Sequence, residues 1–160
     1  AKGLARRIAV IDLDVHQGDG TARIFEHDPS VFTLSVHCEQ NWPRRKAVSD
    51  RDVGVERGTG DAAYLRIAKA AVIEALEASR PDLVFFNAGV DPHAEDRLGL
   101  LDLTDDGLRR REAMVFDEVL RRGVPIVGVV GGGYSRDLDA LARRHAFLHE
   151  AAAQALKVRA

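Results

Sequence analysis

The chain has 160 residues, of which 46% are hydrophobic and 30% charged, so it is long enough to bury one sizeable core. Its formal net charge of −2 and its pI near 6.3 argue against a nucleic-acid-binding surface. A single cysteine, Cys38, excludes an internal disulfide framework and is typical of a cytoplasmic protein. The sequence has no apolar run long enough to span a membrane and no signal-peptide pattern.

Apolar runs and amphipathic segments alternate along the chain. In chain order they predict a strand at 8–11, a helix at 21–26, a strand at 31–36, a helix at 61–78, a strand at 83–86, a helix at 104–122, a strand at 126–130 and a helix at 138–156. The strands show no apolar/polar alternation, which favours burial on both faces of a parallel sheet. We therefore predict a single domain, 1–160, with a doubly wound α/β sheet and helices on both faces. Segment 39–60 is too long and polar for an ordinary connection and is a candidate functional loop.

The first predicted strand ends in a cluster of ionisable residues. The sequence IAVIDLDVHQGDG, residues 8–20, places Asp12, Asp14, His16 and Asp19 within eight residues. Asp14 and His16 are two apart, so on an extended backbone they point to the same side. A carboxylate and an imidazole that converge in this way supply two of the three protein ligands that a catalytic zinc-type site needs.

Polar residues also follow the other predicted strands. Because the carboxyl ends of parallel strands meet at one edge of an open α/β sheet, we expect these residues to share one crevice. The third metal ligand stays open among the residues after the third strand: Asp91, His93, Glu95 and Asp96. After the fourth strand, three consecutive glycines allow close backbone approach, and Tyr134 beside them is a candidate donor to an oxyanion.

Five ordered segments resemble the histone deacetylase superfamily of zinc-dependent amidohydrolases, most closely its class IV branch and bacterial relatives. They are IDLDVHQGDGT, TLSVH, RGTGDAAYL, FFNAGVDPHAEDRLG and VVGGGY. The resemblance implies the arginase/deacetylase-like fold and hydrolysis of an acyl group, typically acetyl, from lysine or a related amine. It also implies a Zn²⁺ cofactor, which Fe²⁺ or Co²⁺ can replace in a site of two aspartates and one histidine.

The same resemblance implies a role for individual residues. It assigns the metal ligands to Asp14, His16 and Asp96, and the polarisation of the substrate carbonyl to Tyr134. Asp12 and Asp19 match two acids that orient a pair of catalytic histidines. An inner K⁺ or Na⁺ site is implied at Ser35 and the carbonyls of Asp12, Asp14, His16 and Val36, and an outer one at the carbonyls of Phe25, Asp28 and Val31. The substrate tunnel is implied at Trp42, Gly132 and Gly133.

One feature of the family is missing from these 160 residues. Complete members carry two adjacent histidines in a Gly-rich segment upstream of the first strand, and one of them is the general base; this sequence contains no adjacent pair. We therefore expect the chain to be the C-terminal part of a deacetylase domain, incomplete on its N-terminal side and inactive alone. Its expected partners are the N-terminal half of the domain and an acyl-lysine or acylated amine substrate, with neither nucleic acid nor membrane; a homo-oligomer stays open.

Three other functions remain as alternatives. A non-catalytic module that keeps the metal site to bind acyl-lysine, or as a structural clamp, competes because the histidine pair is missing. A haloacid-dehalogenase-like phosphatase is disfavoured, since Asp105 and Asp106 lie in the first turn of a predicted helix, where acids serve the helix dipole, and no lysine follows a strand. An arginase-like ureohydrolase is disfavoured because it needs two metals and more bridging aspartates than can be placed in this sequence.

Overall fold

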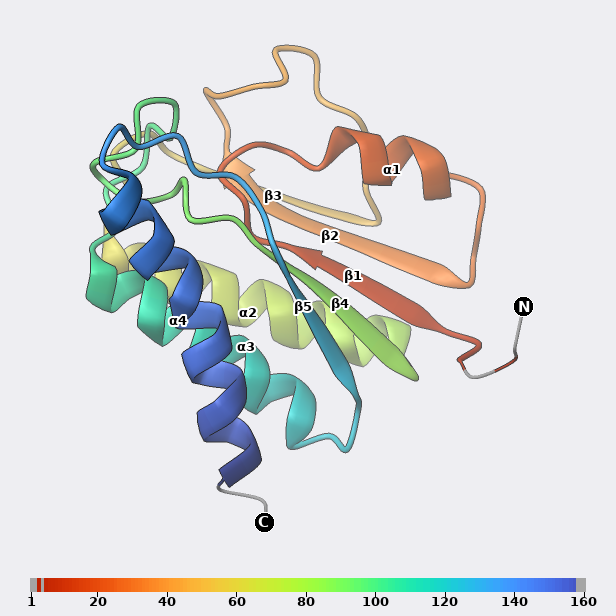
Figure 1. The fold of residues 1–160 in the computed structure, drawn as a ribbon. Helices are drawn as coiled ribbons and strands as arrows, with labels where there is room; N and C mark the ends of the chain where they lie inside the picture. The colour runs from red at the N-terminus through yellow and green to blue at the C-terminus, as the bar shows by residue number, and fades with distance from the viewer. Residues whose placement is uncertain (1–2, 4, 158–160) are drawn as a thin grey trace.

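A computed structural model describes residue 3 and residues 5–157, which form a parallel sheet flanked by helices (Figure 1). The strands are β1 (Ile8–Asp12), β2 (Val31–Cys38), β3 (Arg51–Val55), β4 (Leu83–Ala88) and β5 (Ile126–Val130). The helices are α1 (Asp19–Phe25), α2 (Asp61–Ser79), α3 (Asp105–Leu120) and α4 (Leu138–Lys157). The strand order is β3-β2-β1-β4-β5. The predicted α/β class is therefore confirmed.

Each of the eight predicted elements is present, with ends that differ by a few residues. The N-cap of α3 is Thr104, whose side chain accepts a hydrogen bond from the backbone N–H of Gly107 at 3.1 Å. The prediction that 39–60 is wholly loop is wrong, because β3 lies inside it and pairs with β2. Two charged residues and a glycine among five are depleted in strands, so the sequence signal for this edge strand is weak.

Strand β1 is the point at which the order of the strands reverses, because later strands are added first on one side of it and then on the other. The chain passes from β1 through α1 to β2 and β3 on one side, and then through α2 to β4 on the other side of β1. Helix α1 lies on one face of the sheet, and α2, α3 and α4 lie on the opposite face (Figure 1). In open α/β sheets the crevice at such a switch point is where ligands bind, so the ends of β1 and β4 are the place to look for a site.

The register of the strands brings three polar residues level at this point. Asp12 at the end of β1 is paired with Ser35 in β2 and with Asn87 in β4. The Asn87 Nδ2 donates to Asp12 Oδ1 at 2.9 Å, and the backbone N–H of Asp14 donates to the same oxygen at 3.0 Å. The Asp12 carboxylate therefore joins the end of β4 to the backbone of Asp14, just after β1.

A buried ion pair on α3 holds the carbonyl of Leu13, the residue between Asp12 and Asp14. Arg111 and Glu112 are both fully buried, and the guanidinium makes two hydrogen bonds to the carboxylate, from Nε at 3.1 Å and from Nη2 at 2.6 Å. The remaining Nη1 donates to the carbonyl of Leu13 at 3.0 Å, which the Tyr64 hydroxyl also contacts at 3.4 Å. A buried carbonyl without a partner is costly, so Arg111 satisfies the strand end that immediately precedes Asp14.

One face of the sheet is left uncovered over β4 and β5 in the described part of the chain. Phe85 in β4 is 36% exposed, and its neighbours in β5, Val127 and Val129, are 42% and 41% exposed. β5 is also an edge strand, so its outer backbone groups have no partner strand among the described residues. The helices on both faces that the sequence predicts are thus present, but α1 covers its face over β2 and not over β5.

None of the helices in the described part of the chain has the length and apolar character needed to cross a membrane.

Candidate metal centre

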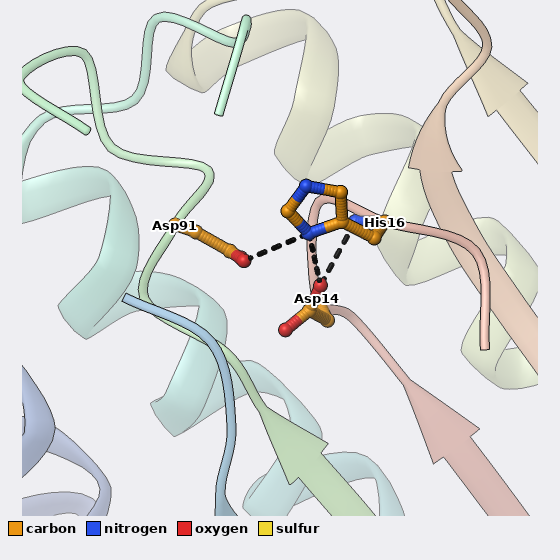
Figure 2. A group of neighbouring side chains, drawn as sticks. All are labelled: Asp14, His16 and Asp91. Carbon is orange, nitrogen blue, oxygen red and sulfur yellow. Dashed lines mark hydrogen bonds and ion pairs between the residues drawn. The ribbon is translucent and has the colours of Figure 1, made fainter. Parts of the chain in front are cut away.

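Three side chains from two strand ends meet at the switch point (Figure 2). Asp14 and His16 follow β1, and Asp91 follows β4. The His16 Nδ1 lies 3.0 Å from Asp14 Oδ1 and 3.1 Å from Asp91 Oδ2. One ligand atom from each of the three residues lies within 4.8 Å of the other two, which is close enough for all three to bind one ion.

Backbone N–H groups from neighbouring segments hold the two carboxylates in place. The N–H of Gly132, which follows β5, donates to Asp14 Oδ2 at 2.8 Å. The N–H of Val15, which follows β1, donates to Asp91 Oδ1 at 2.9 Å. Because each carboxylate is fixed by a segment other than its own, the ends of β1, β4 and β5 are locked together around the cluster.

The electrostatics of the cluster favour a positive charge at its centre. Hydrogen bonds to Asp14 and Asp91 raise the pKa of His16 to about 10, so the ring carries a proton when no metal replaces it. Burial raises the pKa of Asp91 to about 6. Burial also acts to raise the pKa of Asp14, but hydrogen bonds from His16 and Gly132 outweigh it and leave the pKa below its ordinary value.

The donor set fits a divalent metal ion. Two carboxylates and one imidazole are ordinary ligands of zinc-type ions, and three protein ligands leave a position open for water or substrate. Gly132 adds an independent sign of a shaped site, because a Cβ at this position would overlap the carboxylates of both Asp91 and Asp14. The absence of a side chain there leaves the space that the cluster needs.

Asp96, the third ligand implied by the family resemblance, lies outside this cluster. Its Oδ2 accepts the backbone N–H of Tyr134 at 2.6 Å, and its Oδ1 accepts the backbone N–H of Leu98 at 2.8 Å. The cluster contains Asp91 instead, one of the four residues that the sequence left open. A sequence signal for Asp91 existed: it comes three residues after β4, much as Asp14 comes two residues after β1, whereas Asp96 lies farther along the loop.

A cavity of ≈ 500 Å³ opens over Asp14 and His16. Its other walls include Asn41, Trp42, Leu98 and Tyr134. The Tyr134 ring stands edge-on to His16, with centroids 5.9 Å apart and an interplanar angle of 86°. Trp42 and Tyr134, which the sequence analysis assigned to a substrate tunnel and to an oxyanion donor, thus line the same cavity, whereas nothing in the sequence pointed to Asn41.

The remaining predicted site residues lie around this cavity or beside it. Asp12 is buried, and burial followed by the charge of Asp14 raises its pKa to about 7. Asp19 lines the cavity and pairs with Arg23 at 3.3 Å. Gly133 packs near Leu141 and Val90, away from the cavity lining.

The residues implied for cation sites have several partners within the protein. The Ser35 Oγ lies 3.0 Å from His37 Nδ1 and accepts the backbone N–H of Gly18 at 3.4 Å, and Val36 is fully buried. The carbonyl of Phe25 accepts the backbone N–H of Asp28 at 2.9 Å, and the carbonyl of Asp28 accepts the backbone N–H of Val31, the first residue of β2, at 3.1 Å. Whether these groups bind a monovalent ion remains a prediction.

A parallel sheet of this strand order, flanked by helices and with a His–carboxylate cluster at its switch point, defines the protein as an α/β protein of the arginase/deacetylase-like fold. The model of the histone deacetylase domain matches residues 1–150, and the chain belongs to that family. It is 51% identical over 151 residues to an uncharacterised protein of Picosynechococcus sp., covering 94% of this chain and 50% of that protein. It is 34% identical over 142 residues to the histone deacetylase-like amidohydrolase of Pseudomonas aeruginosa, covering 81% of this chain and 37% of that one.

Solved structures agree with the fold. The acetylpolyamine aminohydrolase of Burkholderia pseudomallei superposes with a TM-score of 0.79 at 23% identity, covering 92% of this chain and 45% of that one. The HD domain of HDA15 superposes with a TM-score of 0.71 at 28% identity, covering 96% of this chain and 45% of that one. The chain therefore spans half or less of the length of the relatives it matches.

The close approach of Gly132 to the cluster gives a direct test of its geometry. We expect Gly132→Ala to displace the Asp14 and Asp91 carboxylates and to lower the affinity for one divalent ion by at least about tenfold, the lower end of the 10- to 100-fold typical for lost outer-shell partners. Isothermal titration with Zn²⁺ or Co²⁺ measures the affinity.

Gly20→Ala is the matched control, since a Cβ there meets nothing within 4 Å. Equal affinity of the two glycine variants would show that the cluster tolerates displacement and is not a tight metal site.

Proposed function

We propose that this chain carries the metal-binding and carbonyl-polarising part of a zinc-dependent deacetylase that removes acyl groups from lysine or a related amine. The observation that supports this most is the Asp14–His16–Asp91 cluster, of which Asp14 and His16 line a cavity that Tyr134 also lines. The names of two relatives, a histone deacetylase-like amidohydrolase and an acetylpolyamine aminohydrolase, are consistent with an amide substrate.

Asp14, His16 and Asp91 are the ligands in this proposal, and Asp91 takes the place that the family resemblance gave to Asp96. Bound there, a zinc ion supplies Lewis-acid polarisation of the amide carbonyl and lowers the pKa of a water molecule toward about 7. Iron(II) or cobalt(II) suits the same two aspartates and one histidine. We also propose the monovalent cation site at Ser35 and the neighbouring carbonyls, since Ser35 is buried directly beside Asp12 in the sheet.

The chain's own residues then bind and polarise the substrate. Trp42 and Leu98, which are 68% and 48% exposed, offer apolar surface to the methylene groups of an acyl-lysine side chain. The Tyr134 hydroxyl donates a hydrogen bond to the oxygen that becomes negative as water attacks the carbonyl, and this bond strengthens as the charge develops. Lysine leaves with its amine protonated, and the acyl group leaves as the carboxylate, so the two protons and the oxygen of the water are accounted for.

A general base for the attacking water is the part that these residues do not supply. His16 is the cavity-lining histidine in the described part of the chain, and it is a proposed ligand. His37 and His93 are buried, with 1% and 6% exposure, and neither lines the cavity. We propose that the histidine pair of complete family members supplies the base and that Asp12 and Asp19 orient it.

The uncovered face over β4 and β5 is the proposed contact for the rest of the domain. Phe85, Val127 and Val129 form an exposed apolar strip beside an edge strand, and the chain covers half or less of its relatives. The remaining half of a deacetylase domain is the partner that fits both facts. We propose no nucleic-acid partner, because a formal net charge of −2 offers no excess of positive charge for phosphates. The single, buried and free cysteine supports the proposal of a cytoplasmic protein.

The proposed ligand set predicts which substitutions abolish metal binding. In the protein as its gene encodes it, Asp14→Ala, His16→Ala and Asp91→Ala should each abolish tight binding of one zinc ion, because each removes a third of the protein ligands. Asp96→Ala should keep the ion. Metal content after dialysis, measured by elemental analysis, checks this. Loss of zinc in Asp96→Ala with retention in Asp91→Ala would restore the assignment from the family resemblance; two bound ions would favour the arginase alternative.

Tyr134→Phe separates catalysis from simple binding of acyl-lysine. The phenyl ring keeps the cavity wall but removes the hydroxyl, so turnover of an acetyl-lysine peptide should fall about 100- to 1,000-fold, with a much smaller change in KM. Steady-state kinetics measure both constants. A wild-type protein that binds the peptide without hydrolysing it would instead support the non-catalytic module.

The apolar strip predicts how the 160-residue chain behaves alone. We expect it to self-associate and to lack deacetylase activity, because edge strands and apolar patches invite association. Sedimentation velocity should show a smaller association constant for Val127→Lys/Val129→Lys. The control, Val48→Lys, changes an equally apolar side chain that is 79% exposed elsewhere. A monomeric, active wild-type chain would contradict both parts of this expectation.

A further inference from the structure

The three apolar walls of the cavity come from segments that are neither strand nor helix. Trp42 follows β2, Leu98 lies in the loop between β4 and α3, and Tyr134 follows β5. All three side chains are substantially exposed, at 68%, 48% and 43%. Loop side chains with so little packing are normally mobile, so their relative positions need to be fixed by other contacts.

Two polar side chains supply these contacts, and both bond to the backbone of the wall residues themselves. The Asn41 Oδ1 accepts the backbone N–H of Trp42 at 2.7 Å, while its Nδ2 donates to the Leu98 carbonyl at 2.6 Å. The Asp96 Oδ1 accepts the backbone N–H of Leu98 at 2.8 Å, while its Oδ2 accepts that of Tyr134 at 2.6 Å. A continuous chain of hydrogen bonds thus joins Trp42, Leu98 and Tyr134.

Further contacts hold one end of this chain in place. The Asn41 Nδ2 also donates to the carbonyl of Gly99 at 2.9 Å. The ammonium of Lys46 donates to the carbonyls of Glu39, Asn41 and Pro43 at 3.1, 2.8 and 2.8 Å. The segment that carries Trp42 is therefore organised around the half-buried cation of Lys46, and Asn41 links that segment to the Leu98 segment.

We propose that Asn41 and Asp96 are positioning residues that set the distance from the apolar walls to Tyr134, and so couple the fit of the acyl-lysine substrate to polarisation of its carbonyl. This inference rests on the proposed function. Asp96 suits the task because a carboxylate accepts two backbone N–H groups at once, and such charge-assisted hydrogen bonds are stronger than neutral ones. This role also accounts for Asp96, an acid in the same loop as Asp91 that is not a metal ligand in the proposed set.

Kinetics in the protein as its gene encodes it form the first test. Asp96→Ala should lower kcat on an acetyl-lysine peptide by about 100-fold, the effect expected for a misplacement near 1 Å, with a smaller change in KM and with zinc retained. Asn41→Ala should bring the kcat/KM values for acetyl-lysine and butyryl-lysine peptides closer together, so that their ratio falls by roughly tenfold. Effects of the two substitutions should combine non-additively, because both act on the Leu98 peptide.

The control and a conservative variant guard against loss of folding. Gln40→Ala breaks hydrogen bonds of the neighbouring residue to Glu56 and Arg57, and leaves those to Leu98 intact. It should keep the acyl preference of the wild type. Asp96→Asn keeps one acceptor oxygen and should restore part of the kcat lost in Asp96→Ala, with circular dichroism confirming that each variant is folded.

A second readout does not depend on activity. Trp42 is the single tryptophan of these 160 residues, so its fluorescence reports on the wall directly. Asp96→Ala should change acrylamide quenching of Trp42 even though Asp96 reaches it only through Leu98 and Asn41. If other tryptophans occur in the protein, Trp42→Phe identifies the contribution of Trp42 by difference.

The outcomes separate this inference from the proposed function. Unchanged Trp42 quenching in Asp96→Ala, together with additive kinetic effects, would overturn the positioning role. Loss of zinc in Asp96→Ala would overturn it as well, because Asp96 would then be a ligand. If the wild-type protein hydrolyses no acyl-lysine, the proposed function fails, but a change in Trp42 quenching would still support the link between the walls.

Discussion

Strand β1 lies in the middle of the sheet, and its two neighbours are reached by the chain in opposite directions. β2 follows through α1 on one side, while β4 arrives through α2 on the other. This arrangement places the segment after β1 beside the segment after β4, with helices withdrawn to either face (Figure 1). The contact of His16 with Asp14 and Asp91 depends on it, since neither strand end alone carries more than part of the cluster.

The cluster is kept rigid by hydrogen bonds that cross between segments. Gly132 holds Asp14, Val15 holds Asp91, and Asn87 holds Asp12. Behind them, the buried Arg111–Glu112 pair satisfies the carbonyl of Leu13. A buried ion pair seldom adds much net stability over a well-packed apolar pair, because desolvation of the charges is costly. The pair is connected to the site instead, because Arg111 bonds to the carbonyl of Leu13, the residue before Asp14, and so fixes the chain where it leaves the sheet.

The cavity above the cluster is organised on a different principle. Its floor stands on strand ends, whereas its walls stand on loops that two polar side chains, Asn41 and Asp96, tie together through backbone groups. A floor built on strand ends suits metal ligands, whose tolerance for displacement is small, whereas the position of each wall depends on the hydrogen bonds that these two side chains make.

The sequence by itself predicted the α/β class and every strand and helix except β3, because hydrophobic periodicity is a local property. It also selected Asp14, His16 and Tyr134 as site candidates, because the polar residues that follow a strand can be read locally as well. The family motifs then identified the histone deacetylase domain. Only the tertiary structure places Asp91, and not Asp96, in one cluster with Asp14 and His16, since both acids lie in one irregular loop whose path no spacing rule describes. It alone placed β3, whose pairing comes from β2. It alone showed that nothing in the described part of the chain covers Phe85, Val127 and Val129, because whether an apolar face is buried depends on what packs against it.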